Sequence, residues 1–136
     1  MTIENNEQAR ALIDTFVAAR NARDRARVAE MVTGDIEYVM PRSLRPEPLR
    51  GEAAIDALTG ATTGKHFDLS TIKREVKRVT IEGNVAAVEQ TMSGKTLDGK
   101  DYTNDYLWIY ELRDGKFARL IEYVDTLHAS QTLSTL

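Results

Sequence analysis

The residues of this chain best suited to chemistry are carboxylates and hydrogen-bond donors in its β-type segments. Glu122 and Asp125 lie near the end of the last such segment, and Tyr106 and Asn104 lie in the one before it. Residues two apart share a face of a strand, so Tyr106 and Asn104 could donate to the same carbonyl or enolate oxygen. If Glu122 points into an apolar space, burial raises its pKa, which suits a general acid or base near neutral pH. The alternative is a buried acid satisfied by a partner, or a surface acid facing Arg119.

The chain has no cysteine and two histidines, His66 and His128. Disulfides, thiol nucleophiles and Cys-ligated metal sites are therefore excluded. Asp125 and His128 are three residues apart, so they could meet on a turn or short helix, although we interpret His128 as a cap or rim residue. Two histidines and scattered carboxylates fall short of a dedicated ligand cluster, so we predict neither a metal nor a cofactor.

Charge and hydropathy narrow the class of partner. Lys and Arg number 18 against 21 Asp and Glu, for a net charge of -3, and no basic run is interleaved with aromatic residues. This pattern predicts no nucleic-acid partner. The first residues lack the apolar core of a signal peptide, and no stretch approaches about 18 consecutive apolar residues, so we expect no membrane partner and a cytoplasmic protein.

Three helices are expected ahead of the long β-type segments. Between residues 5 and 20 the apolar residues recur at three- and four-residue spacing, which lines one side of a helix. Asp24 can cap a second, shorter helix that stops at the next glycine. A β-type stretch follows at 36–40, a loop at 41–48 contains all three prolines, and Gly51 opens the third helix.

Four long β-type segments complete the chain and predict an antiparallel meander. Each boundary carries glycine next to Asn or Asp, which indicates a tight reversal with positive φ. In the first segment the apolar positions change from even (Ile72, Val76) to odd (Val79, Ile81), so we predict a β-bulge near Arg78. The four segments are residues 67–82, 84–95, 101–113 and 116–126.

The expected fold class is α+β, in a single domain of residues 1–136: a cone-shaped, curved antiparallel sheet packed on the N-terminal helices. Side chains could fill the space inside the cone, or a cavity could remain. In the segment 101–113 both faces are apolar or aromatic, which indicates that both are covered. One face would line the interior, and the other would contact a second subunit.

Four stretches of the sequence resemble a known family. They are residues 35–41 (DIEYVMP), 49–55 (LRGEAAI), 114–117 (DGKF) and 122–128 (EYVDTLH). In their order they resemble the nuclear transport factor 2-like superfamily, and its SnoaL-like branch is the closest match. The resemblance implies the cone-shaped fold, a small-molecule ligand and a homodimer. It leaves the reaction open, because the superfamily includes ketosteroid isomerases, polyketide cyclases, epoxide hydrolases, dehydratases and proteins without catalysis.

Catalytic positions of two branches are altered in this chain. In place of the isomerase's aspartate base and helix tyrosine, it has Met40 and Phe16, which can neither accept nor donate the proton. Residues 89–91 (Glu-Gln-Thr) stand where limonene-epoxide-hydrolase-like members carry Arg-x-Asp. In SnoaL-like cyclases a last-strand acid is the base, and the resemblance gives that role to Glu122 or Asp125.

Further residues are expected to line the cavity. The family register allows Glu37 and Glu89 to face the interior, but exposed strand acids usually point outward, which is the interpretation we favour. For the large aromatic residues, core or dimer packing is the alternative to a pocket wall. The loop at 41–48 is expected at the cavity rim, and His66 is interpreted as a loop residue, with the cavity mouth as the alternative. The predicted ligand-binding residues are Glu37, Val39, Trp108, Tyr38, Phe16, Thr91 and His128.

We therefore expect a small-molecule-binding protein, and an isomerase or cyclase that uses carboxylate acid–base chemistry on an apolar ring substrate. Its catalytic residues would be Glu122, Tyr106, Asn104 and Asp125. The alternative is a non-catalytic ligand-binding or interaction module of the same fold. An epoxide hydrolase-like enzyme is a further alternative.

Overall fold

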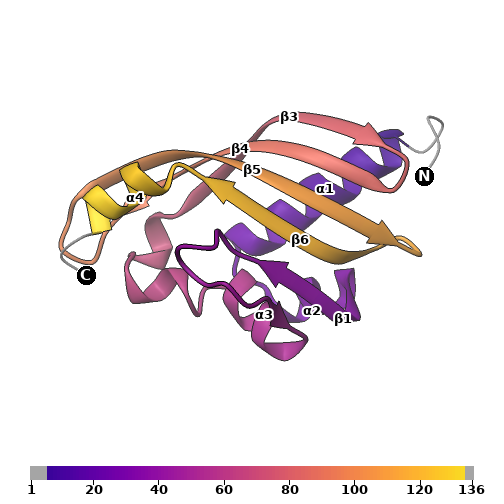
Figure 1. The fold of residues 1–136 in the computed structure, drawn as a ribbon, viewed down its shortest axis with the longest axis horizontal. Coiled ribbons are helices and arrows are strands. Elements are labelled where there is room, and N and C mark those ends of the chain that lie inside the picture. The colour runs from indigo at the N-terminus through magenta and orange to yellow at the C-terminus, as the bar shows by residue number, and fades with distance from the viewer. Residues whose placement is uncertain (1–5, 134–136) are drawn as a thin grey trace.

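The computed structural model describes residues 6–133 as helices packed on a curved six-stranded sheet (Figure 1). The strands lie in the order β2, β1, β6, β5, β4, β3. Neighbouring strands are antiparallel except for β1 and β6, which run parallel. The predicted α+β class is confirmed, and the sheet has one parallel pair that the sequence pattern did not predict.

The first helix, α1 (Asn6–Asn21), buries one side of its surface. Its apolar residues repeat at three- and four-residue spacing, so they form a single stripe toward the core. Ile13 and Phe16 in this stripe are fully buried. The predicted helix at 5–20 is confirmed except at Asn5, which lies outside the described residues.

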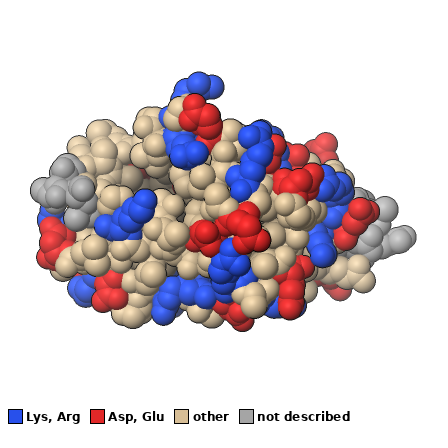
Figure 2. Space-filling model, turned by 90° about the horizontal axis from the view of Figure 1, so that it is seen from below, with Lys and Arg blue, Asp and Glu red and all other residues tan. Residues whose placement is uncertain are grey.

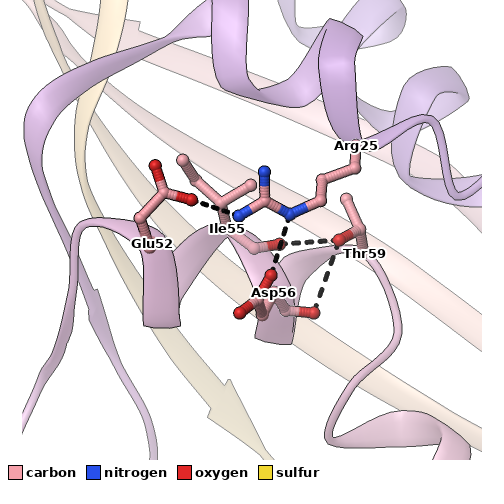
Figure 3. Close-up of polar contacts among 5 residues, drawn as sticks. All are labelled: Arg25, Glu52, Ile55, Asp56 and Thr59. Carbon is pink, nitrogen blue, oxygen red and sulfur yellow. Dashed lines mark hydrogen bonds and ion pairs between the residues drawn. The ribbon is translucent and has the colours of Figure 1, made fainter.

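The second helix, α2 (Arg25–Met31), begins after the predicted cap, where the Asp24 carboxylate accepts a hydrogen bond from the backbone N–H of Arg27 at 3.1 Å. Figure 3 shows how Arg25 joins α2 to α3 (Glu52–Leu58). The Nε of Arg25 donates to Asp56 Oδ1 at 2.8 Å, and its Nη2 pairs with Glu52. These ion pairs are exposed to solvent and add little to stability, but they join α3 to α2.

The strand β1 (Val32–Val39) starts four residues before the predicted stretch at 36–40. Its first half, residues 32–35, contains Gly34 and lacks the alternating apolar pattern of a half-buried strand, so the pattern predicted only the second half. The pairing with β6 is irregular between Val32 and Glu37. The short β2 (Leu49–Arg50) returns antiparallel to β1, so the proline loop reaches out from the sheet and comes back.

The predicted antiparallel meander is confirmed, with the expected turn geometry. Gly83, Gly99 and Gly115 have φ of +62°, +87° and +75°, a region that other residues rarely adopt. The first strand begins later than predicted, because Asp68 caps a short 3-10 turn by accepting from the backbone N–H of Ser70. The four strands are β3 (Lys73–Glu82), β4 (Val85–Lys95), β5 (Asp101–Arg113) and β6 (Lys116–Val124).

The predicted β-bulge in β3 is confirmed at Lys77, where the register with β4 shifts by one residue. The extra residue changes the alternation of the strand. As a result, Arg74 and Val76 before the bulge, and Val79 and Ile81 after it, share the half-buried side.

A further helix, α4 (Thr126–Leu133), follows β6 and packs near the start of β5. The Asp125 carboxylate accepts a hydrogen bond from the backbone N–H of His128 at 3.0 Å and so stabilises the first turn. A turn or short helix was expected at this point, but the sequence analysis did not predict eight helical residues.

Side chains fill one end of the inner face of the sheet. Phe16, Tyr110 and Phe117, which we call the aromatic core, are fully buried. Phe16 stacks on Phe117 with ring centroids 4.3 Å apart, and Tyr110 meets Phe117 edge-on at 5.3 Å. The cone is therefore closed at this end, and any cavity must lie at the other.

The surface seen in Figure 2 carries Lys and Arg interspersed with Asp and Glu, and neither sign forms a continuous patch on this face. Among residues 6–133, no helix is both long and apolar enough to cross a membrane.

Candidate functional site

A cavity of about 130 Å³ opens at the end of the cone away from the aromatic core. The sheet supplies one wall, and the loop after β1, the segment before β3 and α4 supply the others. Met40 and Leu44, before and within the proline loop, lie in the wall, so that loop borders the cavity as expected. A single six-membered ring suits this size, since an engineered protein cavity of about 150 Å³ binds benzene. The polar wall residues that matter below are Arg20, Tyr38, His66, Arg74, Tyr106 and Glu122.

Glu122 lies in the cavity wall on β6 and is 9% exposed. The Tyr38 hydroxyl, on β1, donates to Glu122 Oε1 at 2.7 Å. Burial raises the pKa of Glu122, and the Tyr38 hydrogen bond and the charges of Arg20 and Arg74 oppose that rise. Burial, followed by the negative charge of Glu122, raises the pKa of Tyr38 well above its usual range. The phenol therefore stays protonated and donates to one oxygen of the buried Glu122 carboxyl group.

Tyr106 and Tyr102, both on β5, lie in the wall near Glu122, and their hydroxyl oxygens are 2.9 Å apart. The Asn104 side-chain amide donates to the Tyr102 hydroxyl at 2.8 Å and to the Asp125 carbonyl at 3.0 Å. Burial raises the pKa of Tyr106. The hydrogen bond between the two hydroxyls uses the proton of one phenol, so the proton of the other phenol is available to a ligand. Asn104 thus stands behind the tyrosine pair rather than in the cavity wall.

Two arginines that the sequence analysis missed also face the cavity. Arg20, at the end of α1, is 3% exposed, its Nε donates to the Leu58 carbonyl at 3.1 Å, and its guanidinium lies 4.9 Å from the ring centroid of Trp108. Arg74 enters from β3. Both have a signal in the sequence: Arg20 continues the apolar stripe of α1, and Arg74 lies two residues from the inward-facing Val76. A charged side chain at an inward position needs partners, either from neighbouring residues or from a ligand, so it indicates a candidate binding site.

His66 and Gln90 complete the polar wall. The Nδ1 atom of His66 is buried without a hydrogen-bond partner. Gln90 donates to the Tyr110 hydroxyl at 2.9 Å, so it connects the cavity to the aromatic core. His66 lies in the loop between α3 and β3, as interpreted, and it also lines the cavity, which was the alternative. Trp108 is 3% exposed and contributes its ring to the same wall.

The structure places Glu37 and Val39 outside the cavity wall. The Glu37 carboxylate, 31% exposed, is held by Arg50 and Arg119 at 3.3 Å and 3.6 Å. It points away because Tyr38 faces the cavity and successive strand residues alternate. Thr91 lies on the outer face for the same reason, since Gln90 faces inward, and it donates to Asp105 at 3.1 Å.

Three further candidates serve other parts of the fold. Phe16 belongs to the aromatic core, because its helix position meets the closed end of the cone. Asp125 caps α4 and His128 contacts the Thr103 carbonyl through Nε2 at 2.8 Å, so the two side chains do not form an acid–imidazole pair. The His128 ring stacks on Tyr102 behind the cavity. Among the described residues, no three His, Asp or Glu side chains gather in a metal-ligating group.

A family model described as the SnoaL-like domain matches residues 13–120, most of the chain. This span runs from the apolar stripe of α1 to β6. No curated protein matches the chain.

Solved structures resemble the chain over nearly its full length. A protein of unknown function from Burkholderia pseudomallei, described as NTF2-like, has a TM-score of 0.80 at 15% identity and covers 98% of this chain and 99% of its own. TerC, co-crystallised with polyporic acid, has a TM-score of 0.80 at 20% identity, with 91% and 96% covered. A candidate SnoaL-like polyketide cyclase from Jannaschia sp. CCS1 has a TM-score of 0.69 at 19% identity, with 82% and 79% covered. At these identities the likeness establishes the fold alone.

Proposed function

This chain belongs to the SnoaL-like domain family of the nuclear transport factor 2-like superfamily, and we propose that it binds a small ring compound and acts on it by acid–base catalysis at Glu122. The observation that carries the proposal is the buried Glu122 carboxyl in a cavity wall, with the Tyr38 phenol on one of its oxygens. The co-crystallisation of a fold relative with polyporic acid supports a small-molecule ligand.

The proposed reaction begins with proton abstraction next to a ring carbonyl. The Glu122 carboxylate takes the proton, and the C–H electron pair moves into an enolate. In the Tyr106–Tyr102 pair, the hydroxyl whose proton is not used within the pair donates a hydrogen bond to the enolate oxygen, where negative charge develops. Glu122 then returns the proton to another carbon, which gives isomerisation, or first exchanges it with solvent and reprotonates the same carbon, which gives hydrogen exchange. Tyr38 acts through Glu122 as a positioning residue, and Asn104 acts through Tyr102 in the same way.

Carbon-bound hydrogen exchange tests this function without a known product. Cyclic ketones and β-diketones are incubated with the protein in D₂O, and NMR follows the loss of the α-proton signal. Glu122→Gln, which preserves shape, is expected to slow exchange by about 10²–10⁴-fold. The control is Glu89→Gln, an acid on the outer face that pairs with Arg78. Equal exchange rates in Glu122→Gln and the unsubstituted protein would refute catalysis by Glu122.

A non-catalytic binding module remains the second candidate, and the altered isomerase positions Met40 and Phe16 favour it. In that case the same NMR samples would show ligand signals broadened by binding, with α-protons retained in every variant. The epoxide hydrolase-like alternative has less support, because Glu89 and Thr91 at the Arg-x-Asp positions lie on the outer face, away from the cavity.

We also propose a homodimer formed through the outer face of β5 and β6. This face exposes Leu107 (37%) and Tyr123 (55%), whereas the inner face of the same strands is buried. Exposed apolar side chains on a broad sheet face are suited to a second copy. Light scattering after gel filtration should give twice the 15.3 kDa chain mass, and the double variant Leu107→Glu/Tyr123→Glu should give the chain mass itself.

A further inference from the structure

The cavity holds more positive charge than its own side chains neutralise. The Nη1 atom of Arg20 is buried and has no hydrogen-bond partner. Among residues 6–133, none of the ion pairs includes Arg20 or Arg74. Arg20 donates to the Leu58 carbonyl and lies over Trp108, but these partners carry no negative charge. Placing two guanidinium groups in a cavity wall without an ion-pair partner is costly, so the site is suited to an anionic group that the chain itself does not supply.

The fold holds these two arginines at the same end of the cavity. Asn21, next to Arg20, clamps the backbone of Arg74: its Nδ2 donates to the Arg74 carbonyl at 3.0 Å, and its Oδ1 accepts from the Arg74 N–H at 3.0 Å. Burial, and then the charge of Arg20, lower the pKa of Arg74 to about 9. Arg74 therefore remains a cation at neutral pH. The two guanidinium groups repel each other, which raises the free-energy cost of burying both.

Glu122 does not balance this charge. It is the carboxylate in the cavity wall, it already accepts from Tyr38, and burial raises its pKa. Even a fully ionised Glu122 leaves one of the two cations unmatched. The buried Nδ1 of His66, another wall residue, also lacks a hydrogen-bond partner.

The rest of the wall favours a flat apolar body. The Trp108 ring lies against Arg20, and Phe67 and Tyr102 have ring centroids 5.0 Å apart. Aromatic walls enclose ring compounds, and a few fixed polar groups orient them.

We propose that the ligand is a ring-bearing organic acid in its anionic form, with its ionised oxygen bound by Arg20 and Arg74 and its ring in the aromatic part of the cavity. This inference rests on the proposed function for the use of the cavity as a ligand site, and it adds the substrate class. A guanidinium offers paired N–H donors to an anionic oxygen, which matches the unpartnered Nη1. The bound anion supplies the charge that the cavity lacks, while Glu122 faces another part of the same ring.

Titration calorimetry with matched probes tests this assignment. Benzoate, cinnamate and 2-naphthoate are each compared with the corresponding neutral amide, which has nearly the same shape. We expect at least one acid to bind at least about tenfold more tightly than its amide, as hydrogen bonds to charged groups contribute more than neutral ones. Equal affinities for every acid and amide, or no binding of any probe, would overturn the proposal.

Variants assign the preference to the two arginines. Arg74→Met keeps an unbranched apolar stem but removes the charge, and should abolish most of the acid preference. The matched control is Arg78→Met on the same strand, whose side chain pairs with Glu89 on the outer face and should keep the preference in full. Arg20→Lys retains the positive charge but not the forked N–H donors of the guanidinium, so it should weaken acid binding. It is preferred to Arg20→Met, which could fail to fold. Full acid preference in Arg74→Met and Arg20→Lys would refute the assignment.

Glu122→Gln separates this inference from the proposed catalysis. The variant should still prefer the acid over the amide, because the arginines remain. If it prefers the acid but exchanges α-protons as fast as the unsubstituted protein, catalysis by Glu122 fails and anion binding stands. If exchange falls but acids and amides bind alike, catalysis stands and anion binding fails.

Discussion

The aromatic core and the cavity lie on the same face of β5, yet one is filled and the other is open. At the closed end Tyr110 is fully buried, and its hydroxyl accepts from Gln90. At the open end Tyr106 and Tyr102 share one hydrogen bond between two hydroxyls, and Arg20 has a buried nitrogen without a partner. Aromatic residues alone therefore do not distinguish core from site. The difference is whether the polar groups among them are satisfied within the chain.

Truncation of a phenylalanine should show the largest contrast between the two ends. Phe117→Ala in the aromatic core is expected to lower the free energy of unfolding by about 3–5 kcal/mol. Phe67→Ala, which removes the same atoms beside the cavity, should lower it by about half as much, since the ring already borders open space. Urea unfolding followed by circular dichroism measures both. Equal losses would show that the open end is packed as tightly as the closed one.

Removal of one phenol hydroxyl should separate stability from binding. Tyr110→Phe leaves the buried Gln90 amide without its acceptor and should cost about 1–3 kcal/mol of unfolding free energy. Tyr106→Phe should cost about 1 kcal/mol or less, because Tyr102 keeps its hydrogen bond from Asn104. It should slow α-proton exchange, because it removes one of the two hydroxyls proposed to stabilise the enolate. The comparison fails if Tyr110→Phe is the variant that loses exchange while Tyr106→Phe retains it.

The pH dependence of stability should reveal Glu122. Burial raises its pKa in the folded state above that in the unfolded chain. As pH rises, the unfolded chain releases this proton first, so the folded state loses stability until its own carboxyl ionises. Glu122→Gln cannot ionise, and its amide oxygen can still accept from Tyr38. The free energy of unfolding of Glu122→Gln minus that of the unsubstituted protein should therefore be more positive at about pH 7 than at about pH 4.

Urea unfolding of both proteins across that range measures the difference. We expect a smaller effect than those of the aromatic substitutions, because the carboxyl relieves part of the cost by binding a proton. A difference that does not change with pH would contradict the raised pKa of Glu122.

The ion pair of Arg78 with Glu89 on the outer face should show the smallest effect. Both side chains are largely exposed, so a double-mutant cycle with Arg78→Met and Glu89→Gln should give a coupling energy of about 0–1 kcal/mol. Neither substitution should change ligand binding at the cavity. Because Glu89 lies opposite Leu107 on β5, a coupling above that range would mean that the proposed dimer interface extends over this pair.

Much of the fold was predictable because local patterns determine it. The spacing in α1, the glycines of the turns and the change of phase in β3 each follow from a period or a backbone angle. The parallel pairing of β1 with β6 was not predictable in this way, since it joins segments about 80 residues apart and periodicity reveals a face but not a neighbour. The early start of β1 and the length of α4 were missed because neither has a regular apolar pattern.

The candidate site was predicted in part. Glu122, Tyr106, Tyr38 and Trp108 were named from strand alternation and the family resemblance, and all four lie in the cavity wall. Phe16 was placed at the cavity wrongly, because the apolar stripe of a helix predicts its buried side but not which end of the cone that side meets. Arg20 and Arg74 were missed because arginine is usually exposed. A search for charged residues at inward positions would have found them.

The bulge at Lys77 has a consequence for how this protein can vary. The bulge shifts the alternation of inward and outward side chains between the two halves of β3. Val79 and Ile81 in one half therefore pack on the core, while Arg74 in the other half lines the cavity. Loss of residue 77 would restore strict alternation and leave Arg74, Val76, Val79 and Ile81 on the same side. Straightening of the strand with residue 77 retained would have a different result. If Val79 and Ile81 then stayed inside, Arg74 would turn to solvent, and the proposed anion contact would disappear although every residue that makes it remained.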